Sequence, residues 1–277
     1  MSCAWESLRG ILPLRFREET DRHRNSLQEM RLRMGMPPEL VCGDGRYWLR
    51  DRVTREDLNF ILNGASHYSP WSAATMAQGY LTAPGGHRIG ICGEAVIREG
   101  RLSTFREPTA LCVRVARSFP GIVETLSELD GSILILGPPG SGKTTLLREL
   151  IRGQSDRGIH IAVVDERGEL FPPGADFFPG RCTDVLTGCP KPTGILTLLR
   201  TMGPEVIAVD EITREEDCET LTQAMYCGVR LFATAHASGM EDLHRRPVYR
   251  DLTDRGIFTN AVIMRRDKSW RLERMDL

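Results

Sequence analysis

Residues 133–153, ILILGPPGSGKTTLLRELIRG, decide the fold class of this chain. The stretch begins with four apolar residues, passes through a glycine-rich loop and continues into a segment with helical periodicity. The loop GPPGSGKT, residues 137–144, matches the pattern G-x-x-x-x-G-K-[ST] between a strand and a helix, which is the context that supports the pattern. The sequence therefore predicts a loop that binds the phosphates of a nucleoside triphosphate.

The residue types of this loop suit phosphate chemistry. Gly140 and Gly142 allow the backbone to turn its N–H groups toward a β-phosphate. Lys143 supplies positive charge, Thr144 supplies a hydroxyl to Mg²⁺, and the following helix adds its dipole. We expect ATP and Mg²⁺ as cofactors, with these nucleotide contacts: Gly137, Pro138, Pro139, Gly140, Ser141, Gly142, Lys143, Thr144 and Thr145.

Beyond the loop, the pattern of strand, loop and helix repeats along the chain. Continuous apolar runs that alternate with helices are typical of a parallel sheet covered on both faces. We expect a RecA-like P-loop NTPase domain of α/β class over residues 121–277. Its strands are predicted at 133–136, 160–165, 206–210, 230–236 and 261–265, with a helix that Thr213 and Glu216 cap.

Before residue 120 the chain shows a different pattern of predicted helices and strands. Two helices are predicted, at 15–35 and 53–68, followed by strands at 87–97, 101–107 and 110–117. The first two of these strands are joined by the turn REGR. We expect a smaller α+β domain over residues 1–120.

An Asp-Glu pair follows the strand VIAVDE. Asp210 at the strand end is predicted to bind Mg²⁺ through water, and Glu211 to polarise the attacking water. P-loop proteins with that adjacent glutamate insert another strand between the P-loop strand and the aspartate strand. Residues 230–236 suit the inserted strand, and Thr234 and His236 suit the polar sensor at its end.

A second Asp-Glu pair occurs earlier, at Asp165 and Glu166 in VVDERGE. One interpretation is a solvated loop that begins after a strand. The other is a functional cluster with Glu169 at the carboxyl edge of the sheet, where ligands bind in open α/β folds.

Composition excludes several classes of protein. The chain has 277 residues and a formal net charge of −1, which does not favour a nucleic-acid or anionic-membrane partner. Its apolar runs are too short to span a bilayer, and the first residues lack the features of a signal peptide. The eight cysteines form no CxxC pair, and Cys92 and Cys112 are expected to be small core residues. We expect a reduced, cytoplasmic protein without a transmembrane segment.

The order of motifs resembles the secretion ATPase superfamily, the hexameric motors of type II and type IV secretion and pilus machines. Those motors carry a P-loop, an acidic box, a Walker B strand and a histidine box, which match GPPGSGKTT, VVDERGE, VIAVDEI and TAHA here. Two positions depart from the type II motors. These usually have Gly where this chain has Asp210, and Pro where it has Arg167.

The chain more closely resembles the stage III sporulation protein AA family, the cytoplasmic ATPase of the channel complex between mother cell and forespore. The matching stretches span about residues 27–245. They are LQEMRLRMGMPPEL, GYLTAPGGHRIGICGEAV, VVDERGEL, RCTDVLTGCPK, LLRTMGPEVIAVDEI and LFATAHA.

The resemblance implies a homo-oligomer, expected to be a hexamer, peripheral to a membrane complex whose embedded channel proteins are its partners. It also implies that the front domain supplies arginines to the triphosphate, with Arg88 and Arg114 as candidates; the alternative for each is a surface ion pair. It places Asp165, Glu166 and Glu169 in the acidic box and assigns the pair Asp165 and Glu166 to support and coupling. In the same way, His236 is assigned to sensing the γ-phosphate or transmitting its loss; the alternative is a structural histidine at the end of a core strand.

The roles of one segment and one arginine stay open, and so do two other functions. Residues 188–194, GCPKPTG, are either a plain connector or part of a contact loop, and Arg200 either reaches a neighbour's nucleotide or lies on the surface. The first rival function is a nucleic-acid-associated P-loop ATPase. The composition does not favour it, and we expect no direct nucleic-acid contact. The second is a scaffold that binds ATP with little turnover.

Overall fold

The structure is a computed structural model that describes residues 3–66, 79–117, 126–172 and 177–275. These residues form two compact units. The first unit comprises the described residues up to 117 together with Pro172, and the second comprises 126–171 and 177–275. The predicted domain boundary at residue 120 lies outside the described residues.

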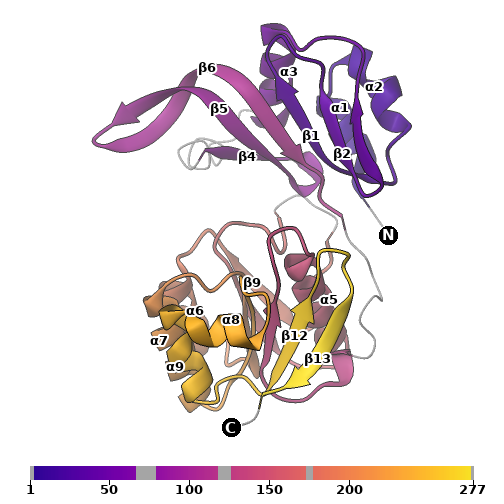
Figure 1. The fold of residues 1–277 in the computed structure, drawn as a ribbon. Coiled ribbons are helices and arrows are strands. Elements are labelled where there is room, and N and C mark those ends of the chain that lie inside the picture. The colour runs from indigo at the N-terminus through magenta and orange to yellow at the C-terminus, as the bar shows by residue number, and fades with distance from the viewer. Residues whose placement is uncertain (1–2, 67–78, 118–125, 173–176, 276–277) are drawn as a thin grey trace. The chain divides into compact units, whose positions relative to one another are not determined.

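The first unit is built on a six-stranded antiparallel sheet in the order β3-β2-β1-β6-β5-β4 (Figure 1). Helices α1, α2 and α3 pack against one face of it, and the core consists of apolar side chains from both layers. The elements are α1 (Trp5–Ile11), α2 (Leu14–Asp21), β1 (Leu27–Arg33), β2 (Glu39–Cys42), β3 (Gly45–Trp48), α3 (Arg55–Ser66), β4 (Tyr80–Ala83), the 3₁₀ turn η1 (Pro84–Gly86), β5 (His87–Arg98) and β6 (Arg101–Arg114).

The predicted helix over residues 15–35 is wrong in its second half. Helix α2 ends at Asp21, and β1 begins at Leu27 in the middle of the sheet. The segment LQEMRLR buries Leu27, Met30 and Leu32 between exposed or half-buried polar residues, a pattern close to the two-residue period of a strand. Pairing with β2 and β6 therefore overrides the helical propensity of Glu, Met, Leu and Arg.

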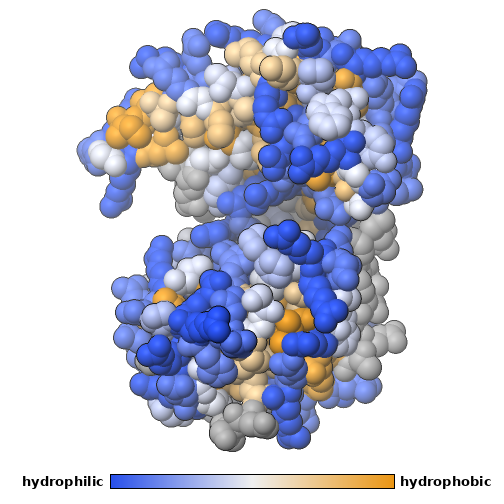
Figure 2. Space-filling view, in the orientation of Figure 1, coloured by the Kyte–Doolittle hydropathy of each residue, from blue (hydrophilic) through white to orange (hydrophobic). Residues whose placement is uncertain are grey.

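Strands β5 and β6 form a hairpin closed by the predicted turn. Glu99 and Gly100 both have positive φ, 50° and 74°, as a two-residue primed turn requires. The strands expected at 101–107 and 110–117 are one continuous strand, β6. The outer part of the hairpin carries apolar side chains on its surface (Figure 2), among them Ile97 at 59% exposure. Cys92 is exposed rather than part of the core as predicted, and Cys112 is half-buried.

His87, at the start of β5, is fully buried in the first unit. Its Nδ1 accepts a hydrogen bond from the Ala116 N–H at 3.1 Å, so the ring proton lies on Nε2, which donates to the Ala4 carbonyl at 3.0 Å. Burial lowers the pKa of His87, and the charge of Arg117 lowers it further. The neutral ring thus ties α1 to the end of β6.

This geometry predicts a pH-dependent stability. An unfolded histidine takes up a proton near pH 6.5, whereas folded His87 resists protonation until a lower pH. The stabilisation is therefore complete above about pH 6.5 and is lost as the pH falls toward the folded pKa. We expect the melting temperature to fall between about pH 7 and pH 5, and His87→Asn to make that slope shallower. His244→Asn, at an exposed site, is the control; equal slopes in all three proteins would contradict the assignment.

The second unit is built on a seven-stranded sheet in the order β13-β12-β7-β11-β10-β8-β9. The pairs from β12 to β9 are parallel, and β13 is antiparallel to β12, so the sheet is mixed rather than wholly parallel as predicted. The elements are the 3₁₀ turn η2 (Leu126–Glu128), β7 (Ile133–Leu136), α5 (Lys143–Asp156), β8 (Ile161–Asp165), β9 (Thr183–Thr187), α6 (Lys191–Thr201), β10 (Val206–Val209), α7 (Glu215–Tyr226), β11 (Arg230–Ala235), α8 (Met240–Arg245), α9 (Pro247–Asp254), β12 (Asn260–Met264) and β13 (Trp270–Arg274).

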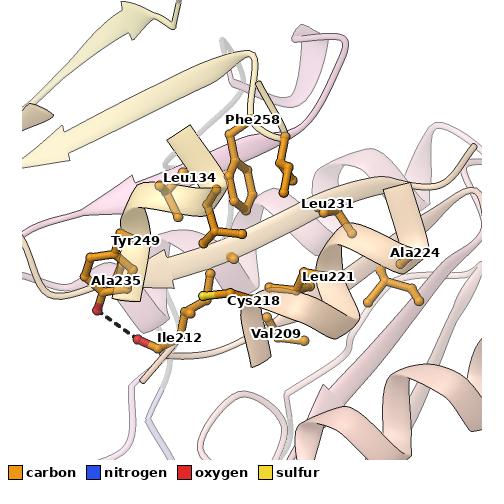
Figure 3. Close-up of a cluster of buried hydrophobic side chains, with 14 of the residues drawn as sticks. Leu134, Val209, Ile212, Cys218, Leu221, Ala224, Leu231, Ala235, Tyr249 and Phe258 are labelled. Atoms are coloured by element: carbon orange, nitrogen blue, oxygen red, sulfur yellow. Dashed lines mark hydrogen bonds between the residues drawn. The ribbon is translucent and has the colours of Figure 1, made fainter. Parts of the chain in front are cut away.

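Both faces of this sheet are covered. Helix α5 packs on one face against Ile133, Ile135 and their neighbours, and α6, α7, α8 and α9 lie together on the other (Figure 1). Figure 3 shows the second layer, in which side chains of α7 and α9 meet alternate residues of the strands. The four residues of β7 and the four of β10 are wholly buried, which explains their continuously apolar sequence.

The cap of α7 differs from the prediction. The helix begins at Glu215, and the carboxylate of Asp217 accepts hydrogen bonds from the backbone N–H groups of Thr213 and Arg214, at 3.1 and 3.2 Å. Asp217 therefore takes the place expected for Glu216. Within the described parts of the chain, no helix is long and apolar enough to cross a membrane.

Candidate nucleotide site

The strand order brings the predicted motifs to one edge of the second unit's sheet. Strand β11 lies between β7 and β10, which confirms the predicted inserted strand. Because parallel strands end at the same edge, the P-loop, His236, Asp210 and Asp165 follow four adjacent strands there.

The P-loop adopts a conformation that depends on glycine. Gly140 and Gly142 have φ of 77° and 99°, and Gly142 directly precedes the first turn of α5. A side chain at Gly137 would place its Cβ 2.6 Å from Ser141 Oγ. The loop therefore closes around Ser141, whose buried hydroxyl has no hydrogen-bond partner among the residues that the structure describes.

Lys143 is folded back into this loop. Its Nζ donates to the carbonyls of Gly137 and Pro138 at 3.0 and 3.1 Å, and to Nδ1 of His236 at 3.0 Å. An ammonium group has three N–H donors, and these contacts use all three. Burial lowers the pKa of Lys143, while Asp210 and Glu211 oppose that shift. A phosphate bound in this loop would therefore have to take over one or more of these donors.

A hydroxyl and a carboxylate lie side by side next to the lysine. Thr144 Oγ1 donates to Asp210 Oδ2 at 2.9 Å, and Thr234 Oγ1 donates to Asp210 Oδ1 at 2.6 Å. Thr234 Oγ1 also accepts the backbone N–H of Glu211 at 2.8 Å. One buried threonine of the inserted strand thus orients the carboxylate of Asp210 and the backbone of Glu211 together.

The backbone at Glu211 is held in an unusual conformation. Its φ is 52°, a region that residues with a side chain rarely adopt. The next residue, Ile212, is fixed on both sides: its N–H donates to the Thr234 carbonyl at 2.8 Å, and its carbonyl accepts the Tyr249 hydroxyl at 2.9 Å (Figure 3). Strain at a polar residue that its surroundings fix so firmly is typical of functional sites.

Both carboxylate oxygens of Glu211 have cationic or polar neighbours. Oε1 lies 3.1 Å from Nε2 of His236, and Oε2 lies 3.3 Å from Nη1 of Arg167. Because Nδ1 of His236 accepts from Lys143, Nε2 carries the ring proton and donates to Glu211. His236 therefore connects Lys143 to Glu211, which lies just after β10.

Asp165 has a different environment from Asp210. It is buried, and its carboxylate accepts the backbone N–H groups of Glu169, Leu170 and Phe171 at 2.8, 3.1 and 2.9 Å. Burial raises the pKa of Asp165 to about 6, against the effect of these hydrogen bonds. The buried guanidinium of Arg148 donates to the Glu169 and Leu170 carbonyls. Through these contacts Asp165 fixes the conformation of residues 166–171, which we call the acidic-box loop.

Glu166 points to another partner. Its Oε2 lies 2.9 Å from Nζ of Lys191, the first residue of α6, and the same Nζ lies 3.9 Å from Oδ2 of Asp217. The GCPKPTG segment therefore contributes a buried cation to the site. The sequence pattern did not identify Lys191, Arg148 or Tyr249 as site residues.

The residues present fit a Mg-nucleotide. Among the described residues the buried Ser141 hydroxyl has no hydrogen-bond partner, and a phosphate oxygen would supply one. Lys143 and the α5 N-terminus offer positive charge to the same ligand. Thr144 and Asp210 present hard oxygen ligands, the type that Mg²⁺ takes while it keeps waters and phosphate oxygens.

Three predicted arginines are not brought to this edge within the second unit. Arg88 and Arg114 belong to the first unit, where Arg88 stacks over the Tyr80 ring at 3.9 Å and Arg114 lies 3.7 Å from Glu29. Their predicted reach to the nucleotide stays a prediction. Arg200 is exposed near the end of α6, at the opposite edge of the sheet.

Comparison with known proteins adds to this picture. The sequence model of the family described as "Sporulation stage III, protein AA" matches residues 6–271. Stage III sporulation protein AA of Bacillus subtilis (strain 168) is 35% identical over 260 residues, which cover 87% of this chain and 83% of that protein.

Two solved structures share the fold. The ATPase DotB of Yersinia pseudotuberculosis superposes with a TM-score of 0.62 at 16% identity, over 89% of this chain and 72% of that one. The pilus retraction motor PilT, solved with bound ADP, gives 0.59 at 18% identity, over 94% and 83%. At such identities the likeness concerns the fold.

Proposed function

The chain belongs to the stage III sporulation protein AA family, and from that premise we propose that it binds Mg-ATP and hydrolyses it as a secretion-like motor. The observation that carries the proposal is the arrangement at the carboxyl edge of the second sheet. There the P-loop lysine, a hydroxyl–carboxylate pair and a glutamate are joined by hydrogen bonds from three adjacent strands. The fold shared with DotB and PilT supports a RecA-like assignment for this unit.

The proposed chemistry consists of positioning and charge stabilisation. Bound Mg²⁺ would neutralise charge on the phosphate oxygens, and Thr144 and Asp210 are the residues that would hold it. Lys143 and the N–H groups of the loop place positive charge on the phosphates. Glu211, aimed by Thr234 and Tyr249 through the backbone, orients and polarises the attacking water.

His236 couples nucleotide binding to Glu211 in this proposal. A phosphate that draws the Lys143 ammonium away from Nδ1 removes one of the two hydrogen bonds that the imidazole makes within the described part of the chain. The ring then keeps its hydrogen bond to Glu211 Oε1 and can rotate with that carboxylate. This supports the predicted sensor role of His236, in which occupation of the phosphate site changes the setting of the water-polarising group.

The proposed assembly, its cellular place and the roles of the remaining site residues rest on the resemblance to the family. We propose a homo-hexamer, because secretion motors of this superfamily assemble as rings, with work done at the cytoplasmic side of a membrane-embedded channel complex during sporulation. The acidic-box residues Glu166 and Glu169 would support the site, and Arg88 would stabilise charge on the triphosphate from the first unit.

One experiment tests hydrolysis and assembly together. Light scattering with mass determination on the purified chain, with and without Mg-ATP, is combined with phosphate release measured on the same samples. We expect a nucleotide-promoted hexamer with slow turnover, both lost when EDTA removes Mg²⁺. Binding without phosphate release in a stable oligomer would favour a nucleotide-gated scaffold.

The same samples also test the alternative of a nucleic-acid-associated ATPase. A monomer that hydrolyses ATP only after single-stranded nucleic acid is added would reject the secretion-like function. We expect added single strands to leave the rate unchanged.

A further inference from the structure

Lysine is rare in this chain, and its placement is informative. The sequence contains 36 lysines and arginines, of which three are lysines: Lys143, Lys191 and Lys268. Lys143 belongs to the P-loop and Lys268 to a surface turn. Lys191 is only 6% exposed at the first turn of α6. A buried ammonium in a chain that otherwise uses arginine indicates a site that needs a compact cation with three donors.

Lys191 lies between two acidic side chains from different segments. Glu166 of the acidic-box loop is 2.9 Å away, and Asp217 of α7 is 3.9 Å away. The close packing of α6 on β8 sets this position: a Cβ added at Gly194 would come within 2.6 Å of a Val164 methyl group. The ammonium therefore holds the acidic-box loop and the beginning of α7 at a fixed separation.

Both of these segments adjoin Glu211. On one side, Asp217 accepts the N–H groups of Thr213 and Arg214, two and three residues after Glu211. On the other side, Arg167 follows Glu166 directly and contacts the Glu211 carboxylate at 3.3 Å. A closed circuit thus runs from Glu211 through Arg167, Glu166, Lys191 and Asp217 back to the backbone after Glu211.

We propose that Lys191 and Arg167 are positioning residues for the hydrolysis of ATP: Lys191 fixes the acidic-box loop, and Arg167 then orients the carboxylate of Glu211. Glu166 acts in this circuit as the anchor of the loop rather than as a group that contacts water. Lys191 itself does not touch the reacting atoms. The inference rests on the proposed function, since it names residues that support the same site.

The kinetic experiment uses three single variants, one double variant and a control. Arg167→Ala and Lys191→Met are each expected to lower kcat about tenfold, with KM changed less than about twofold, because a displaced group slows chemistry without weakening binding. The kcat of the double variant is expected to lie within about twofold of the kcat of either single variant, since both substitutions act through Glu211. Arg167→Lys is expected to recover most of kcat. Arg271→Ala, which removes a comparably exposed ion pair with Glu273, is expected to match the wild type.

A second arm needs no activity. Amide hydrogen exchange on the nucleotide-free protein is expected to be about tenfold faster at residues 166–171 and 213–217 in Lys191→Met, and unchanged there in Arg271→Ala. If Lys191→Met is unstable, the double variant Lys191→Met with Glu166→Gln replaces it, because it also removes the carboxylate charge that loses its partner at 2.9 Å. It is expected to show the same faster exchange.

The outcomes separate the two proposals. A wild-type chain without ATP turnover would reject the proposed function, and hydrogen exchange alone would then decide whether Lys191 anchors the two segments. With an active wild type, an unchanged kcat in Arg167→Ala or in Lys191→Met would overturn the inference. So would unchanged exchange at both segments in Lys191→Met.

Discussion

Glu211→Gln is expected to reduce ATP turnover by about 10³-fold while ATP affinity stays within about threefold of the wild type. Glutamine has the shape of glutamate but lacks the negative charge that polarises water and accepts its proton. The fixed backbone around Glu211, held through Thr234 and Tyr249, does not depend on the carboxylate. The variant should therefore keep its fold and its P-loop.

The same variant is expected to hold ATP in its assembled form. Because binding remains and cleavage is slow, the nucleotide-promoted oligomer should persist longer than that of the wild type. Single-turnover phosphate release and light scattering measure the two effects in one sample. Glu215→Gln, at an exposed acidic residue in the first turn of α7, is the matched control and should behave as the wild type.

Turnover within about tenfold of the wild type would remove Glu211 from the role of water-polarising group. The next carboxylate to test would then be Glu166. In that case its contact with Lys191 would have to open during the reaction. This result would also contradict the circuit proposed for Arg167, since an arginine that orients an unused carboxylate would have no effect on kcat.

The second unit was predictable from sequence because its signals are local and agree with one another. Apolar runs, a glycine loop and strand-end carboxylates each indicate the same α/β fold, and β7, β8, β10, β11 and β12 occur within one residue of their predicted bounds. Strands β9 and β13 were missed. They are edge strands with exposed polar residues, so burial leaves little trace in their sequence. The hairpin partner β13 is also what makes the sheet mixed.

In the first unit, local propensity opposed the tertiary context. The segment around Met30 has residues that favour a helix, and its strand conformation depends on pairing with β6, about 80 residues further along the chain. The strand that pairs with such a central strand cannot be identified from a short stretch of sequence. A two-residue period in the apolar positions was the available signal.

The candidate site shows the same division. Motif chemistry predicts Lys143, Thr144, Asp210 and Glu211, because each belongs to a pattern with a physical role. Lys191, Asp217 and Tyr249 act through contacts between elements that are distant in sequence, and no spacing rule connects them. The rarity of lysine was the one feature of the composition that could have directed attention to Lys191.

Lys143→Met is expected to weaken ATP binding by at least about 100-fold and to reduce turnover to the background rate. Two charge-assisted hydrogen bonds to phosphate oxygens contribute about 3 kcal/mol or more, which corresponds to that factor in affinity. Lys143→Arg is not expected to restore binding, because a planar guanidinium cannot direct three donors into the loop as the ammonium does. Equilibrium titration with a fluorescent ATP analogue measures the affinity.

The stability of the nucleotide-free protein distinguishes this functional loss from unfolding. Methionine at 143 leaves the Gly137 and Pro138 carbonyls and His236 Nδ1 without their donor, which is destabilising. It also removes a charge that burial disfavours, as the lowered pKa of Lys143 indicates, and this opposes the loss. We therefore expect the free energy of unfolding to change by less than about 1 kcal/mol. Lys268→Met, at an exposed turn, is the control for removal of a lysine. Retained ATP affinity in Lys143→Met would show that the loop does not hold the phosphates, and the function proposed for the site would be rejected with it.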